Sequence, residues 1–172
     1  MDGRRNGHKS ERAAARGADA RDPDDAHDAA PGGQVLTPDA FIGRWRLDRR
    51  IHDRLTGQES RLEGEAVMRP QGADIAYDEE GRLEFPGQPP MIATRSYLWQ
   101  PDGDGVWVFF EDGRPFHRFS LALTMPEASH HCPPDMYYVS YNFTRWPSWG
   151  ATWTVRGPRK DYRIESSYTR LG

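Results

Sequence analysis

Hydrophobic and polar residues alternate with a two-residue period along most of the chain after residue 40. In residues 43–51, for example, one face carries Trp45, Leu47 and Ile51, while the other face carries charged residues. This period is typical of a half-buried β-strand. The same pattern predicts about nine strands, within residues 43–51, 62–69, 75–85, 91–100, 105–111, 115–123, 136–144, 150–156 and 161–170.

Short turn sequences separate the predicted strands, among them 101–105, 111–114 and 157–160, where Gly, Asp and Pro are concentrated. Connections this short join antiparallel neighbours. A sheet of so many strands without covering helices has to protect its edges by closing on itself or by forming a sandwich. We therefore expect an all-β fold, a single antiparallel up-and-down β-barrel, with one short helical turn at Thr37-Pro38 before the first strand.

The first part of the chain has a different composition. Residues 1–34 contain six basic and seven acidic residues, and Met1 is their only apolar side chain larger than alanine. Such a segment cannot bury enough apolar surface to offset the entropy of ordering it. We therefore predict a disordered polar tail over residues 1–36, with a partner-binding arm as the alternative, and a β-barrel domain over residues 37–172.

Composition narrows the classes of function. The 172 residues contain 23 Lys and Arg against 26 Asp and Glu, without the basic excess of nucleic-acid-binding proteins. No apolar run approaches the roughly 20 residues that cross a bilayer, and the N-terminus lacks the apolar core of a secretory signal. The single cysteine, Cys132, excludes an internal disulfide and fits a reducing compartment. We expect a cytoplasmic protein with no nucleic-acid partner and no membrane span.

The start of the first predicted strand carries a recognisable motif. Gly43-Arg44-Trp45 follows a short helical turn, and this arrangement resembles the Gly-x-Trp opening of the lipocalin-like (calycin) barrels. In that superfamily an Arg of the last strand packs over the Trp in a cation–π contact. The resemblance implies a calycin-like barrel with Arg170 in this role, and Arg163 is the alternative position.

A series of sequence blocks extends over nearly all of residues 41–170. The blocks are Phe41-Ile-Gly-Arg-Trp-Arg-Leu, Gly64-Glu-Ala, Glu80-Gly-Arg-Leu, Tyr97-Leu-Trp, Asp112-Gly-Arg-Pro-Phe-His117, His131-Cys-Pro-Pro-Asp-Met-Tyr137 and Gly157-Pro-Arg-Lys-Asp-Tyr162. Together they resemble an uncharacterised bacterial domain-of-unknown-function family (DUF 6314). The resemblance implies one domain over this range, and it implies no particular activity.

Reactive side chains are concentrated between residues 114 and 137. His117 falls on the same face of its predicted strand as Phe119 and Leu121, which makes it an inward candidate, while the others lie in or beside a Pro-rich loop. A histidine is suited to proton transfer near neutral pH. If the side chains converge, they predict an isomerase, cyclase or lyase; the alternative is that they cap a turn and pack. The candidate catalytic residues are His117, His131, Cys132, Asp135 and Tyr137.

The same segments allow two cofactor hypotheses. Zinc accepts the residue types of His117, His130, His131, Cys132 and Asp135, but their spacing contains no CxxC or HxxxH pattern, so we predict no metal site. A haem pocket similar to that of the nitrobindin-like barrels would use His117 or His131 as the iron ligand. The sequence favours neither cofactor.

Two arginines and several aromatic residues share the predicted inward faces. Arg49 lies on the face of Trp45, and Arg95 lies on a face with Tyr97 and Trp99. The other face of the strand that contains Arg95 is almost as apolar, so both orientations of Arg95 stay open. An Arg inside an apolar barrel needs a carboxylate, either of the protein or of a ligand. The candidate ligand-binding residues are Trp45, Arg49, Arg95, Tyr97, Trp99, Tyr141 and Trp153.

These observations favour a binding protein for a small hydrophobic or amphipathic molecule. A proton-transfer enzyme and a haem-binding barrel are the alternatives within the same fold. A structural or protein-interaction domain is a third class, since the edges of a barrel can also recruit partners.

Overall fold

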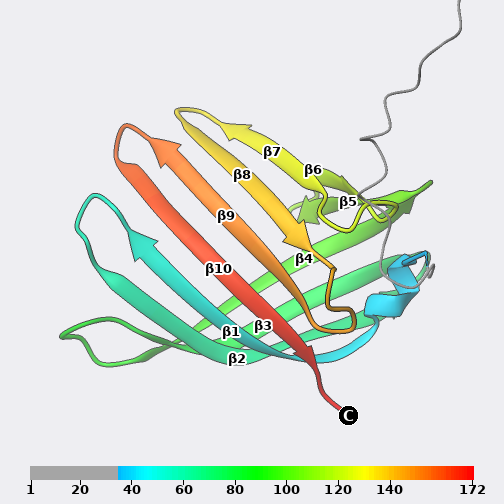
Figure 1. The fold of residues 1–172 in the computed structure, drawn as a ribbon, viewed down its shortest axis with the longest axis horizontal. Helices are drawn as coiled ribbons and strands as arrows, with labels where there is room; N and C mark the ends of the chain where they lie inside the picture. Colours follow the sequence, from blue (N-terminus) through cyan, green and yellow to red (C-terminus); the bar gives the residue numbers. More distant parts are fainter. Residues whose placement is uncertain (1–34) are drawn as a thin grey trace, which may run out of the picture.

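The chain forms strands along almost its whole described length. The computed structural model describes residues 35–172, so residues 1–34 of the predicted tail lie outside it, while Leu36 is buried in the core. A 3-10 helix, η1 (Pro38–Phe41), provides the predicted helical turn. Within these residues ten strands follow: β1 (Gly43–Asp53), β2 (Glu59–Gln71), β3 (Asp74–Glu84), β4 (Met91–Asp102), β5 (Gly105–Phe110), β6 (Pro115–Ser120), β7 (Glu127–Cys132), β8 (Asp135–Asn142), β9 (Trp149–Gly157) and β10 (Lys160–Arg170) (Figure 1).

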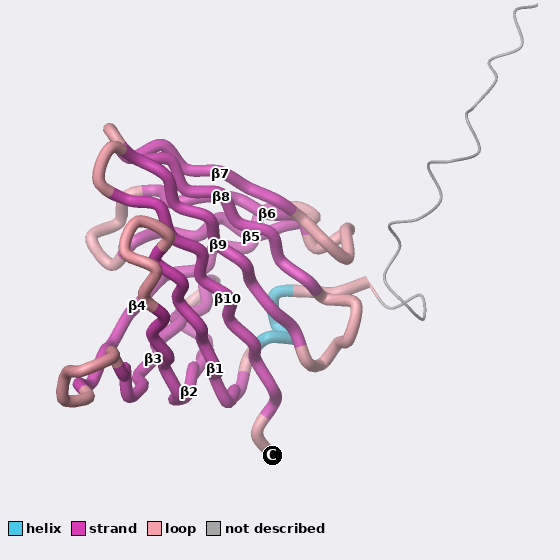
Figure 2. Tube along the Cα trace, turned by 60° about the vertical axis from the view of Figure 1, so that its left-hand side comes forward, coloured by secondary structure: helices cyan, strands magenta, loops and turns pink. Residues whose placement is uncertain are grey.

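The strands form one antiparallel sheet that wraps around a core. Their order is β6-β5-β4-β3-β2-β1-β10-β9-β8-β7, so consecutive strands pair from β1 to β6 and from β7 to β10, and β1 pairs with β10. In the described sheet the edge strands are β6 and β7, which touch without a hydrogen-bonded ladder. The fold is therefore a single up-and-down barrel that is nearly closed, and the predicted fold class is confirmed (Figure 2).

The sequence pattern misses β7. This strand pairs with β8 from Glu127↔Ser140 to Cys132↔Asp135. Its sequence, Glu-Ala-Ser-His-His-Cys, has no large apolar side chain, so the alternation that marks the other strands is absent. The prediction of a Pro-rich loop at His131 and Cys132 is therefore wrong, because both residues belong to a strand. The sheet has ten strands instead of the predicted nine or so.

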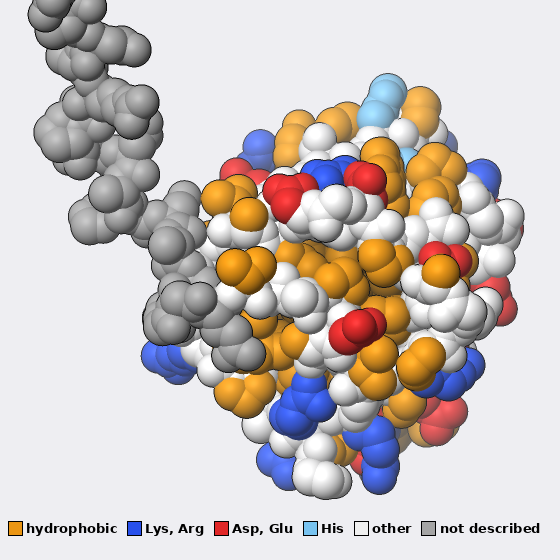
Figure 3. Space-filling model, turned by 90° about the vertical axis from the view of Figure 1, so that its right-hand side faces the viewer, with side chains coloured by type: hydrophobic (Ala, Val, Ile, Leu, Met, Phe, Trp, Pro, Cys, Tyr) orange, Lys and Arg blue, Asp and Glu red, His pale blue; other side chains and the backbone are white. Residues whose placement is uncertain are grey.

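Aromatic side chains fill the end of the barrel that carries η1. Phe41 packs against Phe143, Trp146 and Trp149 with ring centroids 4.7 to 5.6 Å apart. The indole N–H of Trp45 donates to the carbonyl of Phe41 at 2.9 Å, which ties η1 to β1. Viewed from this end, apolar side chains gather over the middle of the face (Figure 3). This end of the barrel is closed by packing.

Arg170, the last residue of β10, covers the closed end from outside. Its guanidinium lies 4.4 Å from the ring centroid of Trp45 and donates to the carbonyls of Ala40 and Ile42. The cation–π contact implied by the calycin resemblance is thus confirmed, with Arg170 in the role. Arg163 instead makes a salt bridge on the outer surface.

The variant Arg170→Lys tests this contact, since lysine keeps the charge but cannot hold two carbonyls while covering the ring. We expect the free energy of unfolding to fall by about 1–2 kcal/mol, from a weakened cation–π contact and a lost hydrogen bond. Urea denaturation of the full chain measures the change. The matched variant Arg163→Lys should stay within about 0.5 kcal/mol of the wild type, because surface salt bridges contribute little. Equal losses in the two variants would contradict the assigned role.

Candidate functional site

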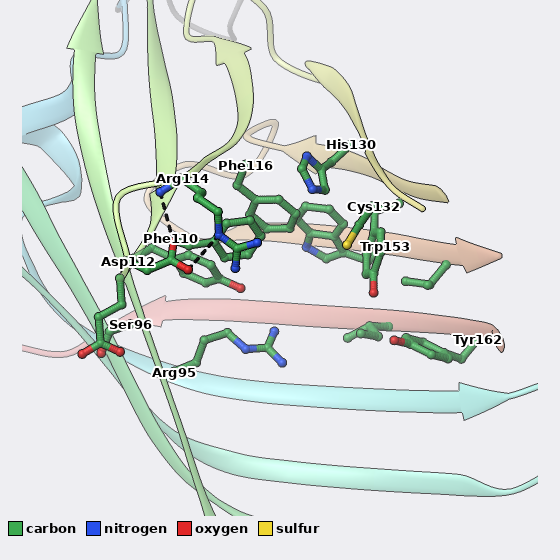
Figure 4. A pocket seen from close by; sticks show the side chains of 15 residues that line it. Arg95, Ser96, Phe110, Asp112, Arg114, Phe116, His130, Cys132, Trp153 and Tyr162 are labelled. Atoms are coloured by element: carbon green, nitrogen blue, oxygen red, sulfur yellow. Dashed lines mark hydrogen bonds and ion pairs between the residues drawn. The ribbon is translucent and has the colours of Figure 1, made fainter. Parts of the chain in front are cut away.

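The end of the barrel opposite η1 is open and leads into a pocket of about 800 Å³, here called the mouth pocket. Side chains from β4 to β10 line it, among them Arg95, Phe116, His130, Trp153 and Tyr162 (Figure 4). Pockets that hold small molecules have volumes of roughly 300–1,000 Å³. The mouth pocket is therefore large enough for a ligand of drug or pigment size.

Stacked aromatic rings form the floor of the mouth pocket. Phe116 lies parallel to Trp153, with 5.0 Å between ring centroids and 3° between planes. Tyr97 also stacks on Phe116, with 5.7 Å between ring centroids, and Phe110 packs against Phe116 with 4.4 Å between centroids. These four rings come from β4, β5, β6 and β9. They give the pocket an apolar, aromatic floor, which suits a ligand with an apolar aromatic body.

Arg95 extends into the mouth pocket from β4 (Figure 4). Of the two orientations that the sequence leaves open, the structure has the inward one. The side chain is 49% exposed, and its Nε lies 4.0 Å from the Glu79 carboxylate, at the limit of an ion pair. Arg114, at the rim, is instead held by Asp112 at 2.7 Å. Arg95 therefore presents a cationic, hydrogen-bonding group to whatever enters the pocket.

Arg49 lies deeper in the barrel, and protein groups occupy its guanidinium. Its Nη1 and Nη2 donate to the two carboxylate oxygens of Glu79 at 2.6 and 2.7 Å, and its Nε donates to Ser166 Oγ at 2.8 Å. The hydroxyl of Tyr77 donates to the same carboxylate. Burial alone would raise the pKa of Glu79, but the hydrogen bonds and charge of Arg49 lower it below its ordinary value. The carboxylate that Arg49 requires is thus Glu79.

His117 lies beneath the aromatic floor. It is only 4% exposed, and its Nε2 is 2.7 Å from the Tyr141 hydroxyl. Burial, with a smaller contribution from the nearby His130, lowers the pKa of His117 to about 3, so its ring is neutral at physiological pH. His117 does not line the mouth pocket. It lines a second cavity of about 40 Å³ together with Tyr141 and Trp149, here called the inner cavity.

The other predicted catalytic residues do not gather at one place. Cys132 and Tyr137 line the mouth pocket. His131 is exposed on β7 and lines neither cavity, and Asp135 forms a salt bridge with Lys160 at 2.7 Å. Proton transfer by this set requires the side chains to meet at one ligand atom. In the structure the five candidates are divided between the two cavities and the surface, so the predicted set is not assembled.

Comparisons with known proteins place the sequence in a family. The chain matches the model described as Family of unknown function (DUF6314) over residues 41–170. It belongs to the family DUF6314. The match extends from η1 to the end of β10, so it covers the whole DUF6314 barrel. A search of curated proteins gave no match.

Six solved chains match the DUF6314 barrel in structure. One is the S-type phycobiliprotein lyase CPES from Guillardia theta, with a TM-score of 0.59 and 10% sequence identity. The alignment covers 78% of this chain and 90% of the lyase chain. At this identity the likeness shows a shared fold, which agrees with the predicted calycin-like barrel.

The predicted ligand-binding residues of the DUF6314 domain occupy three levels of the barrel. Those that line the mouth pocket are Arg95, Tyr97 and Trp153. Those that line only the inner cavity are Trp99 and Tyr141. Arg49 and Trp45 lie in the packed interior and line neither space.

Among the residues of the mouth pocket that the sequence does not assign to a ligand site are Phe116 and His130, the latter named only as a possible zinc ligand. Both line the pocket, and their rings meet edge to face at 5.1 Å. Because side chains alternate along a strand, assigning β7 would have turned His130 inward and His131 outward. The haem hypothesis names His117 and His131, and neither of them lines the mouth pocket.

Clusters of metal-ligating groups and membrane-spanning helices are both absent from residues 35–172. No group of three or more His, Cys, Asp or Glu side chains in this range is arranged to hold a metal ion. No helix of the described chain is long and apolar enough to cross a membrane.

The variant Glu79→Gln should strongly destabilise the DUF6314 domain, because it leaves the buried Arg49 without its counter-charge. Breaking a buried ion pair on one side costs about 3–5 kcal/mol of unfolding free energy. Urea denaturation at neutral pH measures the loss. Glu63→Gln, which removes an exposed carboxylate paired with Arg61, is the matched control and should cost less than about 1 kcal/mol. Similar losses in the two variants would show that the Glu79 carboxylate is not the partner that Arg49 requires.

His117 should make stability depend on pH. Its pKa is about 3 in the folded chain and near 6.5 when exposed, so the unfolded chain binds the extra proton between these values. Stability is therefore lost as pH falls from about 6.5 towards 3, with a slope of up to about 1.4 kcal/mol per pH unit. Unfolding free energies of the wild type and His117→Phe at pH 4.5, 5.5 and 6.5 measure the slope, which the variant should reduce. The exposed His131→Phe variant should keep the wild-type slope; a wild-type slope in His117→Phe would refute the assignment.

Proposed function

We propose that this chain is a binding protein for a flat, amphipathic small molecule that carries a carboxylate. The mouth pocket supports this proposal because it combines a stacked aromatic floor with the inward guanidinium of Arg95. Burial of the apolar body of a ligand against the rings supplies most of the affinity. The carboxylate supplies orientation.

The choice of a carboxylate rests on the charges around Glu79. That carboxylate is held in a two-pronged contact by Arg49, and Arg95 approaches it only to 4.0 Å. Two guanidinium groups thus face one carboxylate, and a carboxylate of a ligand would give Arg95 the close partner that Glu79 does not. The planar guanidinium of Arg95 fits the two oxygens of a carboxylate in a bidentate pair.

The fold is consistent with a ligand of this class. The lyase that shares the barrel acts, by its name, on phycobiliproteins. A bilin is a conjugated carboxylate, and biliverdin is therefore a useful probe beside simpler aromatic acids. Native mass spectrometry of the protein purified from its own host should reveal the natural ligand directly.

A matched pair of probes tests the anchoring role of Arg95. Fluorene-2-carboxylate and its uncharged carboxamide have the same flat apolar body, so only the acid should depend on the charge of Arg95. In Arg95→Gln we expect the acid to bind at least about tenfold more weakly, while the amide changes little. Isothermal titration calorimetry on the full chain gives both dissociation constants.

The variant Arg82→Gln is the control, because Arg82 lies on β3, where it pairs with Glu84 at the surface. It should bind both probes as the wild type does. The proposal fails if neither aromatic acids nor biliverdin bind and the protein from its host carries no small molecule. The anchoring role fails if Arg95→Gln and Arg82→Gln bind the acid equally well.

A further inference from the structure

The inner cavity lies directly below the mouth pocket and shares part of its lining. Arg95, Tyr97, Phe116 and Trp153 line both spaces, so the two adjoin at these side chains. The inner cavity has a volume of about 40 Å³. This is room for a single water molecule or for one functional group of a ligand.

Two buried nitrogen atoms at this cavity have no hydrogen-bond partner within residues 35–172. They are Nδ1 of His117 and Nε1 of Trp149. The two side chains are only 4% and 5% exposed, and both line the inner cavity. Buried polar atoms are almost always hydrogen-bonded in folded proteins, so two exceptions at one cavity point to a group bound between them.

The rest of the contacts hold both rings in place. His117 uses its other nitrogen on Tyr141 at 2.7 Å, and Trp149 stacks on Tyr168 with centroids 3.7 Å apart and planes 5° from parallel. Neither ring can turn away to find another partner without losing these contacts. The two unpaired nitrogen atoms are therefore fixed features of the cavity wall.

The chemistry of the two nitrogens defines what they bind. An indole N–H only donates, so Trp149 requires an acceptor. A neutral imidazole nitrogen donates or accepts according to tautomer, which allows it to pair with the same acceptor atom or with a hydroxyl proton. An oxygen atom satisfies both, and the volume leaves no room for an extended group.

We propose that the inner cavity is a binding site for one neutral oxygen atom, held between Trp149 Nε1 and His117 Nδ1. In the unliganded protein this oxygen is that of a water molecule. In the liganded protein it is a carbonyl or hydroxyl oxygen of the ligand, a second polar group close to the carboxylate that Arg95 holds. The second statement rests on the proposed binding function, and the first does not.

Nuclear magnetic resonance of the ¹⁵N-labelled full chain tests the water. The indole N–H of Trp149, assigned by its loss in Trp149→Phe, should show a cross-peak to a long-lived water. The indole of Trp45 is the internal control, because it already donates to the carbonyl of Phe41 and should show none. The variant serves only for the assignment, and the cross-peak itself is measured on the wild type.

A second matched pair of probes tests the ligand oxygen. 9-Oxofluorene-2-carboxylate adds one carbonyl to fluorene-2-carboxylate and changes little else. We expect the ketone to bind the wild type about fivefold to tenfold more tightly, and Trp149→Phe to remove this preference. Arg95→Gln should weaken both acids alike, because the carboxylate and carbonyl contact different groups.

The outcomes separate the two proposals. A water cross-peak, without any probe binding and without a small molecule in the protein from its host, supports the oxygen site and rejects the binding function. A ketone preference that depends on Trp149 supports the site with the ligand as the source of the oxygen. If Trp149 shows no water cross-peak and the two acids bind equally, the oxygen site is overturned, whatever their affinity.

Discussion

The contact between Arg49 and Glu79 divides the interior of the barrel into two halves. A guanidinium and a carboxylate removed from water are stable only when each satisfies the other, and here the two-pronged contact between β1 and β3 does so. On the side of η1, aromatic rings pack around Phe41 and Trp45. On the other side, Arg95 extends into the mouth pocket. The polar pair thus lies between the packed end of the barrel and the mouth pocket.

In the proposed function, this pair also bears on what the mouth pocket recognises. Glu79 is held closely by Arg49 and lies 4.0 Å from Arg95, so Glu79 is not a close partner for Arg95. An isolated buried guanidinium would be very costly, whereas one that borders an open pocket keeps part of its hydration. Arg95, half exposed, is in this intermediate position. The free-energy cost of burying Arg95 is therefore low enough to be tolerated. In the proposed function, its hydrogen-bond donors, which lack a close carboxylate, select an anion.

Local sequence patterns predict much of the fold. The two-residue period around Trp45 predicts β1 and the inward side chain of Arg49, and Gly43-Arg44-Trp45 leads to the contact with Arg170. The sequence pattern does not predict β7, because this strand forms by pairing with β8 and not through an alternation of its own side chains. A short strand without large apolar residues has no period to detect.

The site was less accessible to prediction, since it depends on distances across the barrel. Arg95 has apolar neighbours on both faces of β4, so only the closed sheet decides its direction. The strand pattern makes His117 an inward candidate and His117 is buried, but a sequence does not show that it lines another space than Cys132 and Tyr137. The inner cavity depends on Trp149, which reads as one more core aromatic until its partners are known.

The missing ladder between β6 and β7 has a mechanical consequence. Every other pair of neighbours is held by backbone hydrogen bonds that fix the circumference, but at this seam only side chains meet, with Phe116 against His130. Spreading the seam therefore breaks no backbone pairing. The same two residues form part of the lining of the mouth pocket. Aromatic packing therefore sets the width of the pocket at this seam of the described sheet, where residues 121–126 join the two strands at one end but no backbone ladder pairs them.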